Sequence, residues 1–143
     1  MNIEQNLTIL QTAYAAALVD AVSRFDEAGV LQEVVERRRR HRGGAQACRF
    51  FGVTTPREVF TRLTELFGCA AWELEEEDDG FTAVTKGCRM HHLAARTGAP
   101  SPCELYCLEP MRDLLGALAP GARFEVEETL AAGDCCRVRV RLS

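Results

Sequence analysis

The chain has 143 residues, 47% of them hydrophobic and 27% charged, and its formal net charge is −4. This length is typical of one domain with its own core, and the acidic balance gives no general attraction to nucleic acid or to a membrane surface. The first residues lack a basic segment followed by an apolar one, and no apolar run approaches the ~18 residues of a membrane span. We therefore expect one cytoplasmic domain over residues 1–143, without nucleic-acid or membrane partners.

Residues 3–28 show apolar positions at steps of three and four, the pattern of a helix with one buried face. The stripe consists of Ile3, Leu7, Leu10, Tyr14, Leu18, Val22 and Phe25. Alanines between positions 13 and 17 widen it, and small side chains allow two helices to approach closely. The pattern therefore predicts a long amphipathic helix and a homodimer through the N-terminal helices.

Two further helices are predicted before residue 69. One covers residues 30–41 and ends in the basic run Arg37–Arg42, which lacks interleaved aromatic residues. We interpret this run as a solvated helix end whose arginines pair with the acidic segment 73–79 of the same chain or of a partner chain. The other begins at the capping box of Thr55 and Glu58, with proline at its favoured position, and ends at Gly68. Residues 1–68 would thus form a helical part and residues 69–143 a cysteine-rich α+β part.

The hydrophobic period changes to two in two places, and each predicts a β-hairpin. Residues 72–85 alternate around an Asp-Asp-Gly turn, and residues 124–142 alternate around Ala132-Gly133-Asp134. In the second hairpin glutamates and arginines share the solvent face, so Cys136 should point inward and Cys135 outward. We expect an α+β fold: N-terminal helices, then two β-hairpins separated by helices, forming an antiparallel sheet covered on one side by helices.

The segment between the hairpins concentrates cysteine and histidine. Cys88 lies at a predicted helix start, with His91 and His92 one turn later on the same face. Ser101, Pro102 and Glu104 form a second capping box, which places Cys103 in a first turn where amide groups and the helix dipole favour a thiolate. Cys107 follows one turn later. The helix should kink or break at Pro110, which cannot donate to the carbonyl of Tyr106.

Three stretches in the second half resemble a known family. They are Gly87-Cys88, Ser101-Pro102-Cys103-x3-Cys107 and the ending Glu128–Cys136. Over roughly residues 70–143 the chain resembles the L-2-amino-thiazoline-4-carboxylic acid hydrolase-like family and is distantly similar to 4-vinyl reductase domains. These share a fold with Golgi transport subunits that hold an acyl chain. The resemblance implies this fold and, if the domain is an enzyme, a hydrolase of small C–N or C–S heterocycles.

Three functions remain open for this segment. The first is a metal site, because thiolates and imidazole suit Zn²⁺ and, less well here, an iron–sulfur cluster. Its four ligands would be Cys88, Cys103, Cys107 and either His91 or Cys136. The alternative is that these cysteines are small apolar core residues, as free cysteines commonly are. The seven cysteines cannot all pair within the chain, and clustered cytosolic cysteines favour metal binding or catalysis over disulfides.

The second function is hydrolysis, with a thiolate at Cys88 or Cys103 activated by His91 or His92, or with water activated by a metal. Opening a thiazoline ring needs water attack on an amidine-like carbon and protonation of the leaving nitrogen or sulfur. The third function is a ligand-binding sensor without turnover, in which apolar side chains enclose a small molecule.

Overall fold

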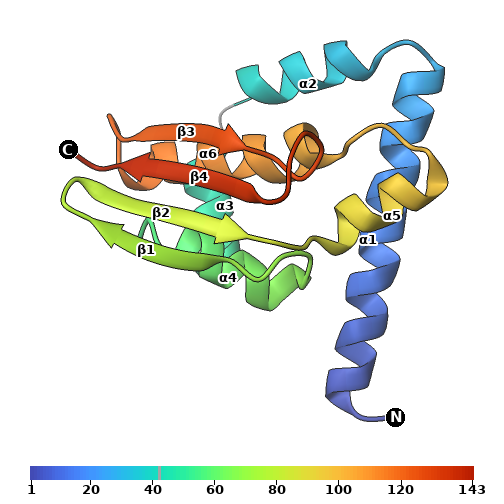
Figure 1. Cartoon of the computed structure of the whole chain (residues 1–143), viewed down its shortest axis with the longest axis horizontal. Coiled ribbons are helices and arrows are strands. Elements are labelled where there is room, and N and C mark those ends of the chain that lie inside the picture. Colours follow the sequence, from blue (N-terminus) through green and yellow to red (C-terminus); the bar gives the residue numbers. More distant parts are fainter. Residues whose placement is uncertain (42) are drawn as a thin grey trace.

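The computed structural model describes residues 1–41 and 43–143, and over these residues the chain forms helices packed on one antiparallel sheet (Figure 1). The predicted α+β class and the order of helices and hairpins are confirmed. The helices are α1 (Ile3–Glu27), α2 (Leu31–Arg40), α3 (Gly44–Phe51), α4 (Glu58–Phe67), α5 (Arg89–Thr97) and α6 (Glu109–Leu118), and a π-helical turn, η1 (Glu104–Leu108), runs directly into α6. The strands are β1 (Glu73–Glu77), β2 (Gly80–Thr85), β3 (Arg123–Glu128) and β4 (Cys136–Arg141).

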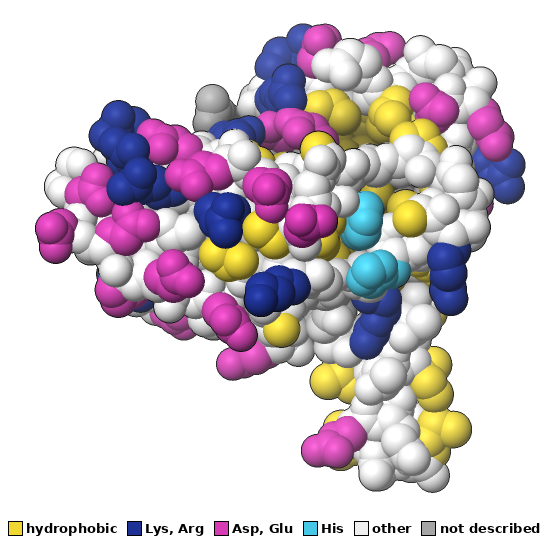
Figure 2. All heavy atoms as spheres, in the orientation of Figure 1, with side chains coloured by type: hydrophobic (Ala, Val, Ile, Leu, Met, Phe, Trp, Pro, Cys, Tyr) yellow, Lys and Arg dark blue, Asp and Glu magenta, His cyan; other side chains and the backbone are white. Residues whose placement is uncertain are grey.

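The sheet has the strand order β1-β2-β4-β3, so the two predicted hairpins join through their second strands. Phe81 faces Val140 and Ala83 faces Val138 across the β2–β4 pair, and all four side chains are buried. On the other face of the sheet Glu125 lies opposite Arg139 and forms an ion pair with Arg141 at 3.3 Å. Figure 2 shows acidic and basic side chains interspersed over this part of the surface.

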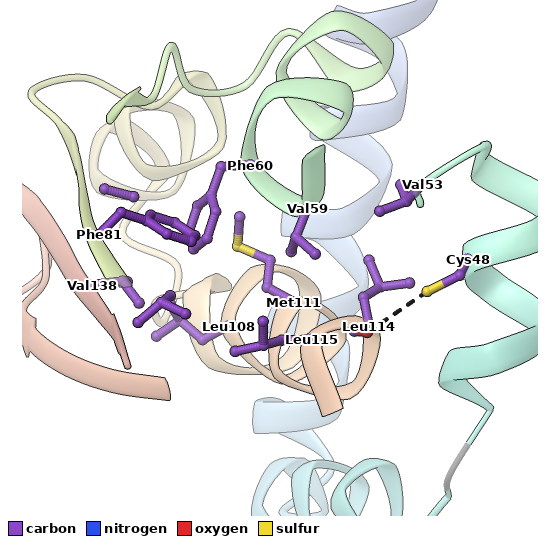
Figure 3. Close-up of a cluster of buried hydrophobic side chains, with 12 residues drawn as sticks. Cys48, Val53, Val59, Phe60, Phe81, Leu108, Met111, Leu114, Leu115 and Val138 are labelled. Atoms are coloured by element: carbon purple, nitrogen blue, oxygen red, sulfur yellow. Dashed lines mark hydrogen bonds between the residues drawn. The ribbon is translucent and has the colours of Figure 1, made fainter. Parts of the chain in front are cut away.

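The main core lies between the sheet and the helices α3, α4 and α6 (Figure 3). Phe60 of α4 packs edge-on against Phe81 of β2, with ring centroids 5.6 Å apart. The sequence pattern did not predict α3, which follows two glycines. One of them, Gly44, is required by packing, because a Cβ there would lie 2.3 Å from the backbone oxygen of Asp113 in α6. The absence of a side chain at Gly44 therefore allows the N-terminus of α3 to lie against the backbone of α6.

Helix α1 forms where it was predicted, but the expectation that its whole stripe is buried is wrong. The most buried residues are Ala15, Val19 and Val22, whereas Ile3 is 84% and Leu10 67% exposed. The reason is that α1 contacts α5, α2 and α4 from about Gln11 onward, and its first turns project from the body (Figure 1). Among the described helices, α1 included, none has the length and apolarity that a membrane span requires.

The predicted break at Pro110 takes the form of the π-helical turn η1. The backbone N–H of Glu109 donates to the carbonyl of Glu104, five residues back, and the chain then continues as α6. The wider turn accommodates the proline, which lacks an N–H, without ending the helix. The capping box before it forms only in part. Ser101 accepts from the backbone N–H of Cys103 at 3.3 Å, but Glu104 turns away to Arg39.

The carboxylate of Glu109 joins α2 to this helix. It is only 6% exposed and accepts from Arg39 of α2 at 3.0 Å and from Arg112 at 2.5 Å. Burial alone would raise the pKa of Glu109, but the hydrogen bond from Arg39 and the charge of Arg112 outweigh it and lower the pKa. The expected pairing of the basic run with residues 73–79 is therefore wrong for Arg39. Arg42 lies outside the described residues.

The acidic segment has other partners. Glu76 pairs with Arg57 before α4, and Glu77 pairs with Arg139 of β4 at 2.8 Å. These arginines lie beside the hairpin in the folded chain, so the segment does not need the basic run.

Replacing Glu109 by glutamine tests the junction between α2 and α6. We expect Glu109→Gln to lower the free energy of unfolding by about 2 kcal/mol at neutral pH, because two charged hydrogen bonds are lost. A carboxylate with a lowered folded pKa stabilises above its unfolded value of 4.5 and loses this effect as the pH falls through the folded value. Denaturant titrations should therefore show the difference shrinking below that pH. Glu73→Gln, an exposed site, is the control, and an equal cost at both sites would contradict the prediction.

The exposed half of α1 keeps the homodimer as a prediction. Residues 1–19 hold a single charged side chain, Glu4, and hydrophobic side chains line the projecting end of the helix (Figure 2). We expect light scattering to show a dimer at micromolar concentration, and Leu10→Glu to convert it to a monomer that melts cooperatively. Thr12→Glu, elsewhere on the same helix, should leave the dimer intact. A monomeric unmodified protein would contradict this prediction.

Candidate functional site

A cavity of about 600 Å³ lies between α1, α2, α3, α4 and the η1–α6 helix. Its size is within the range of typical ligand pockets. Most of its wall is apolar or aromatic, and the larger side chains come from four different elements or their ends: Tyr14, Leu18, Leu63, Phe67, Trp72 and Tyr106. Trp72, the first residue of the predicted hairpin, precedes β1, packs edge-on against Phe60 and lines this cavity.

One end of the cavity is charged. Helix α2 contributes Arg37, Arg38 and His41, and the opposite helix contributes Glu109 and Asp113. Glu109 is already paired with Arg39 and Arg112, whereas Arg37 and Arg38 form no ion pair with any described residue. Positive charge therefore exceeds negative charge at this end.

Thiols form part of the cavity wall and the layer behind it. Cys69, Cys88 and Cys107 line the cavity, and Cys103 and Cys136 lie close enough to shift the pKa of Cys107. Residue 70 bridges Cys88 as an isolated antiparallel pair, and the N–H of Arg89 donates to the Cys69 carbonyl at 2.7 Å. The fold thus brings together the four predicted cysteine ligands and adds Cys69, which the sequence analysis missed.

Burial makes these thiols weak acids. It raises the pKa of Cys69 and of Cys103 to about 11 and raises that of Cys107 well above its usual value. The hydroxyl of Ser101 and the backbone amide of Cys103 do lower the pKa of Cys103, as its helix-start position predicts, but burial outweighs them. The expected thiolate at Cys103 is therefore wrong for this structure, because loss of solvent disfavours the charged form more than the helix start favours it.

The two histidines of α5 lie away from the cavity. His91 and His92 have ring centroids 5.6 Å apart, and the exposed His92 lies in a separate shallow groove with Thr12 and Arg96. Within residues 1–41 and 43–143, no side-chain hydrogen bond joins a histidine to a cysteine, although the backbone N–H of His92 donates to the carbonyl of Cys88 at 3.0 Å, one helical turn back. In the same residues no three side chains of His, Cys, Asp or Glu are arranged to hold a metal ion.

The C-terminal motif forms a closed loop around Glu128. Its carboxylate accepts from the backbone N–H of Cys135 at 3.2 Å and from the Cys135 thiol at 2.7 Å. A Cβ at Gly133 would lie 2.8 Å from the Glu128 carboxyl carbon, so a larger residue there would displace the Glu128 side chain. The prediction that Cys135 is exposed is wrong: it is 7% exposed, because it precedes β4 and folds back onto Glu128.

The loop also fixes the last cysteine of the cluster. Cys136, the first residue of β4, is buried as predicted, and its sulfur accepts from the N–H of Leu130 at 3.3 Å. The spacing from Glu128 to Cys136 is therefore explained by a loop that is held by the Glu128 carboxylate and that places the Cys136 thiol near Cys107.

Several residues of the site had no signal in the sequence that identified them as such. Tyr14 and Tyr106 occupy positions typical of apolar helix faces, and Arg37 and Arg38 belong to a run interpreted as solvated. The sequence placed Arg37 and Arg38 on a helix by its periodicity, but that periodicity does not indicate which element the two arginines face.

The sequence matches the profile of the L-2-amino-thiazoline-4-carboxylic acid hydrolase family over residues 2–140. The match extends beyond residues 70–143, where the resemblance was recognised, into the N-terminal helices that wall the cavity. A comparison with curated proteins finds no significant match, and neither does a comparison with solved structures. Because the family match spans nearly the whole chain, this protein belongs to the L-2-amino-thiazoline-4-carboxylic acid hydrolase family.

Proposed function

We propose that this domain binds a small organic molecule in the cavity between its helices. The observation that carries the proposal is the cavity itself: about 600 Å³, with mostly apolar walls and a few polar groups gathered at one end. This combination is typical of ligand sites, in which apolar contacts supply affinity and sparse polar groups fix orientation. A cytoplasmic location fits the seven free cysteines, since such thiols persist where disulfides are reduced.

Hydrolysis of a thiazoline-like ring is a second candidate, and the family match favours it. Of the predicted catalytic residues Cys88, His91 and His92, only Cys88 lines the cavity. The raised pKa values of Cys69 and Cys107 make their thiols poor nucleophiles at neutral pH. Activated water is therefore the better attacking group. Asp113 lies in the cavity wall as a carboxylate that can accept its proton, and a neutral thiol can donate to the leaving atom.

A cavity-filling variant tests binding and turnover together. Calorimetric titration with the thiazoline acid should show saturable binding, and release of a thiol should follow if the ring opens. Ala47→Trp introduces a large side chain into the cavity wall and should weaken binding by about tenfold or more. Ala45→Trp, on the exposed side of the same helix, is the matched control. Equal binding by both variants would contradict the proposed site.

The cysteine cluster supports metal binding as a further candidate. Cys88, Cys103, Cys136 and Cys69 all lie close enough to Cys107 to raise its pKa. Such soft donors suit Zn²⁺ in a four-sulfur set, or an iron–sulfur cluster. Binding would require these thiols to lose their protons and to rotate toward a common centre, because the described side chains do not already surround one.

Metal content measured on protein purified without chelator checks this candidate. We expect Cys103→Ser and Cys107→Ser each to lose most of the bound metal, because each removes one of four donors. Affinity should also fall as the pH falls, since the ligands must be deprotonated. Cys48→Ser is the control, because Cys48 is buried elsewhere and contacts the carbonyl of Leu114 at 3.6 Å. Unmodified protein that binds no zinc under reducing conditions would rule the metal centre out.

A further inference from the structure

We infer that Arg38, Tyr14 and Tyr106 recognise a carboxylate at the charged end of the cavity, and that the attached body is apolar and larger than a thiazoline ring. This inference rests on the proposed function, because it names the class of ligand for the same cavity. It assigns the headgroup site to three side chains from three elements: α2, α1 and η1.

The three side chains lie near one another and keep their donors available. The Arg38 guanidinium carbon lies 6.0 Å from the centre of the Tyr106 ring. Tyr14 stacks on Phe67, with ring centroids 5.3 Å apart, and both Arg38 and Tyr106 are close enough to influence its acidity. Burial raises the pKa of Tyr14, so its hydroxyl is a protonated donor at neutral pH. No described residue accepts a hydrogen bond from either tyrosine hydroxyl or forms an ion pair with Arg38.

The surrounding charges favour an anion at this point. The nearest buried carboxylate, Glu109, is held by Arg39 and Arg112, and Glu104 is held by Arg39. Asp113 lies in the same wall near the start of α3, where a Cβ on Gly44 would be 3.0 Å from its Oδ1. Arg37 and Arg38 therefore remain as cations without a described counter-ion. The planar Arg38 guanidinium can bind a carboxylate through two parallel N–H groups, and the neighbouring Tyr14 and Tyr106 each carry a further hydroxyl donor.

The dimensions of the cavity set the size of the ligand. A five-membered ring with one carboxylate would fill only a small part of about 600 Å³. The rest of the cavity wall consists of aromatic and aliphatic side chains and the neutral thiols of Cys69 and Cys107, and Cys69 lies close enough to Tyr14 to influence its pKa. An aromatic or aliphatic body suits such a wall, because moving its apolar surface out of water is favourable and the sulfur and aromatic groups of the wall are polarizable.

A matched pair of probes tests the headgroup site. Naphthylacetate and naphthylacetamide have nearly the same shape and differ in charge. Calorimetric titration of the full chain should show the acid binding about tenfold more tightly than the amide. Arg38→Met should remove this preference while still covering the Tyr106 ring, and Tyr14→Phe and Tyr106→Phe should each reduce it. Arg40→Met, which removes the same charge from α2 outside the cavity wall, should keep it. Thermal melts of each variant show that the fold is retained.

Each remaining outcome has a defined meaning. Equal binding of acid and amide would overturn the headgroup site and leave the proposed function standing. The same would follow if Arg40→Met removed the preference as fully as Arg38→Met, because the attraction would then be general. Binding of the thiazoline acid without binding of naphthylacetate would overturn the inferred size. Failure of all three compounds to bind would overturn the proposed function itself.

Discussion

The cavity depends on the contact between Glu109 and its two arginines. A carboxylate removed from water is unfavourable unless it is paired, and here Arg39 arrives from α2 while Arg112 arrives from the next turn of α6. The pairing fixes α2 over the η1–α6 helix and so holds Arg37, Arg38 and His41 at the cavity wall. One buried charge therefore serves both the packing of a helix and the electrostatics of the site. Figure 1 shows the consequence, with α2 lying across the top of the molecule apart from the other helices that cover the sheet.

The cysteines illustrate how burial and local position compete. Cys103 begins a helical segment, where backbone amides stabilise a negative charge, and yet loss of solvent raises its pKa to about 11. Glu128 shows the opposite balance, because the hydrogen bonds that it accepts from Cys135 lower its pKa. The Cys103 thiol is therefore neutral, whereas the Glu128 carboxylate is charged and holds the loop before β4 through its hydrogen bonds. Cysteine thus lines a cavity at Cys107 and donates a hydrogen bond to a carboxylate at Cys135.

Family membership and geometry make different contributions to the functional argument. The family match extends over the helices that form the cavity wall. The geometry adds what a family name does not contain: which side chains meet, which are protonated, and which charges are already paired. It separates the histidines of α5 from the cavity and directs attention to tyrosines and arginines that no motif singled out.

The sequence by itself determined the α+β class, the extent of α1, both hairpins and the burial of Cys136, because each depends on local periodicity and turn residues. It also placed the disturbance at Pro110, where the missing N–H is a property of the residue alone. Only the tertiary structure decided that the first turns of α1 are exposed, that Arg39 pairs with Glu109, and that Cys135 is covered by Glu128. It also decided that burial outweighs the helix start at Cys103. These outcomes depend on which distant segments meet, and a pattern of three or four residues carries no information about that.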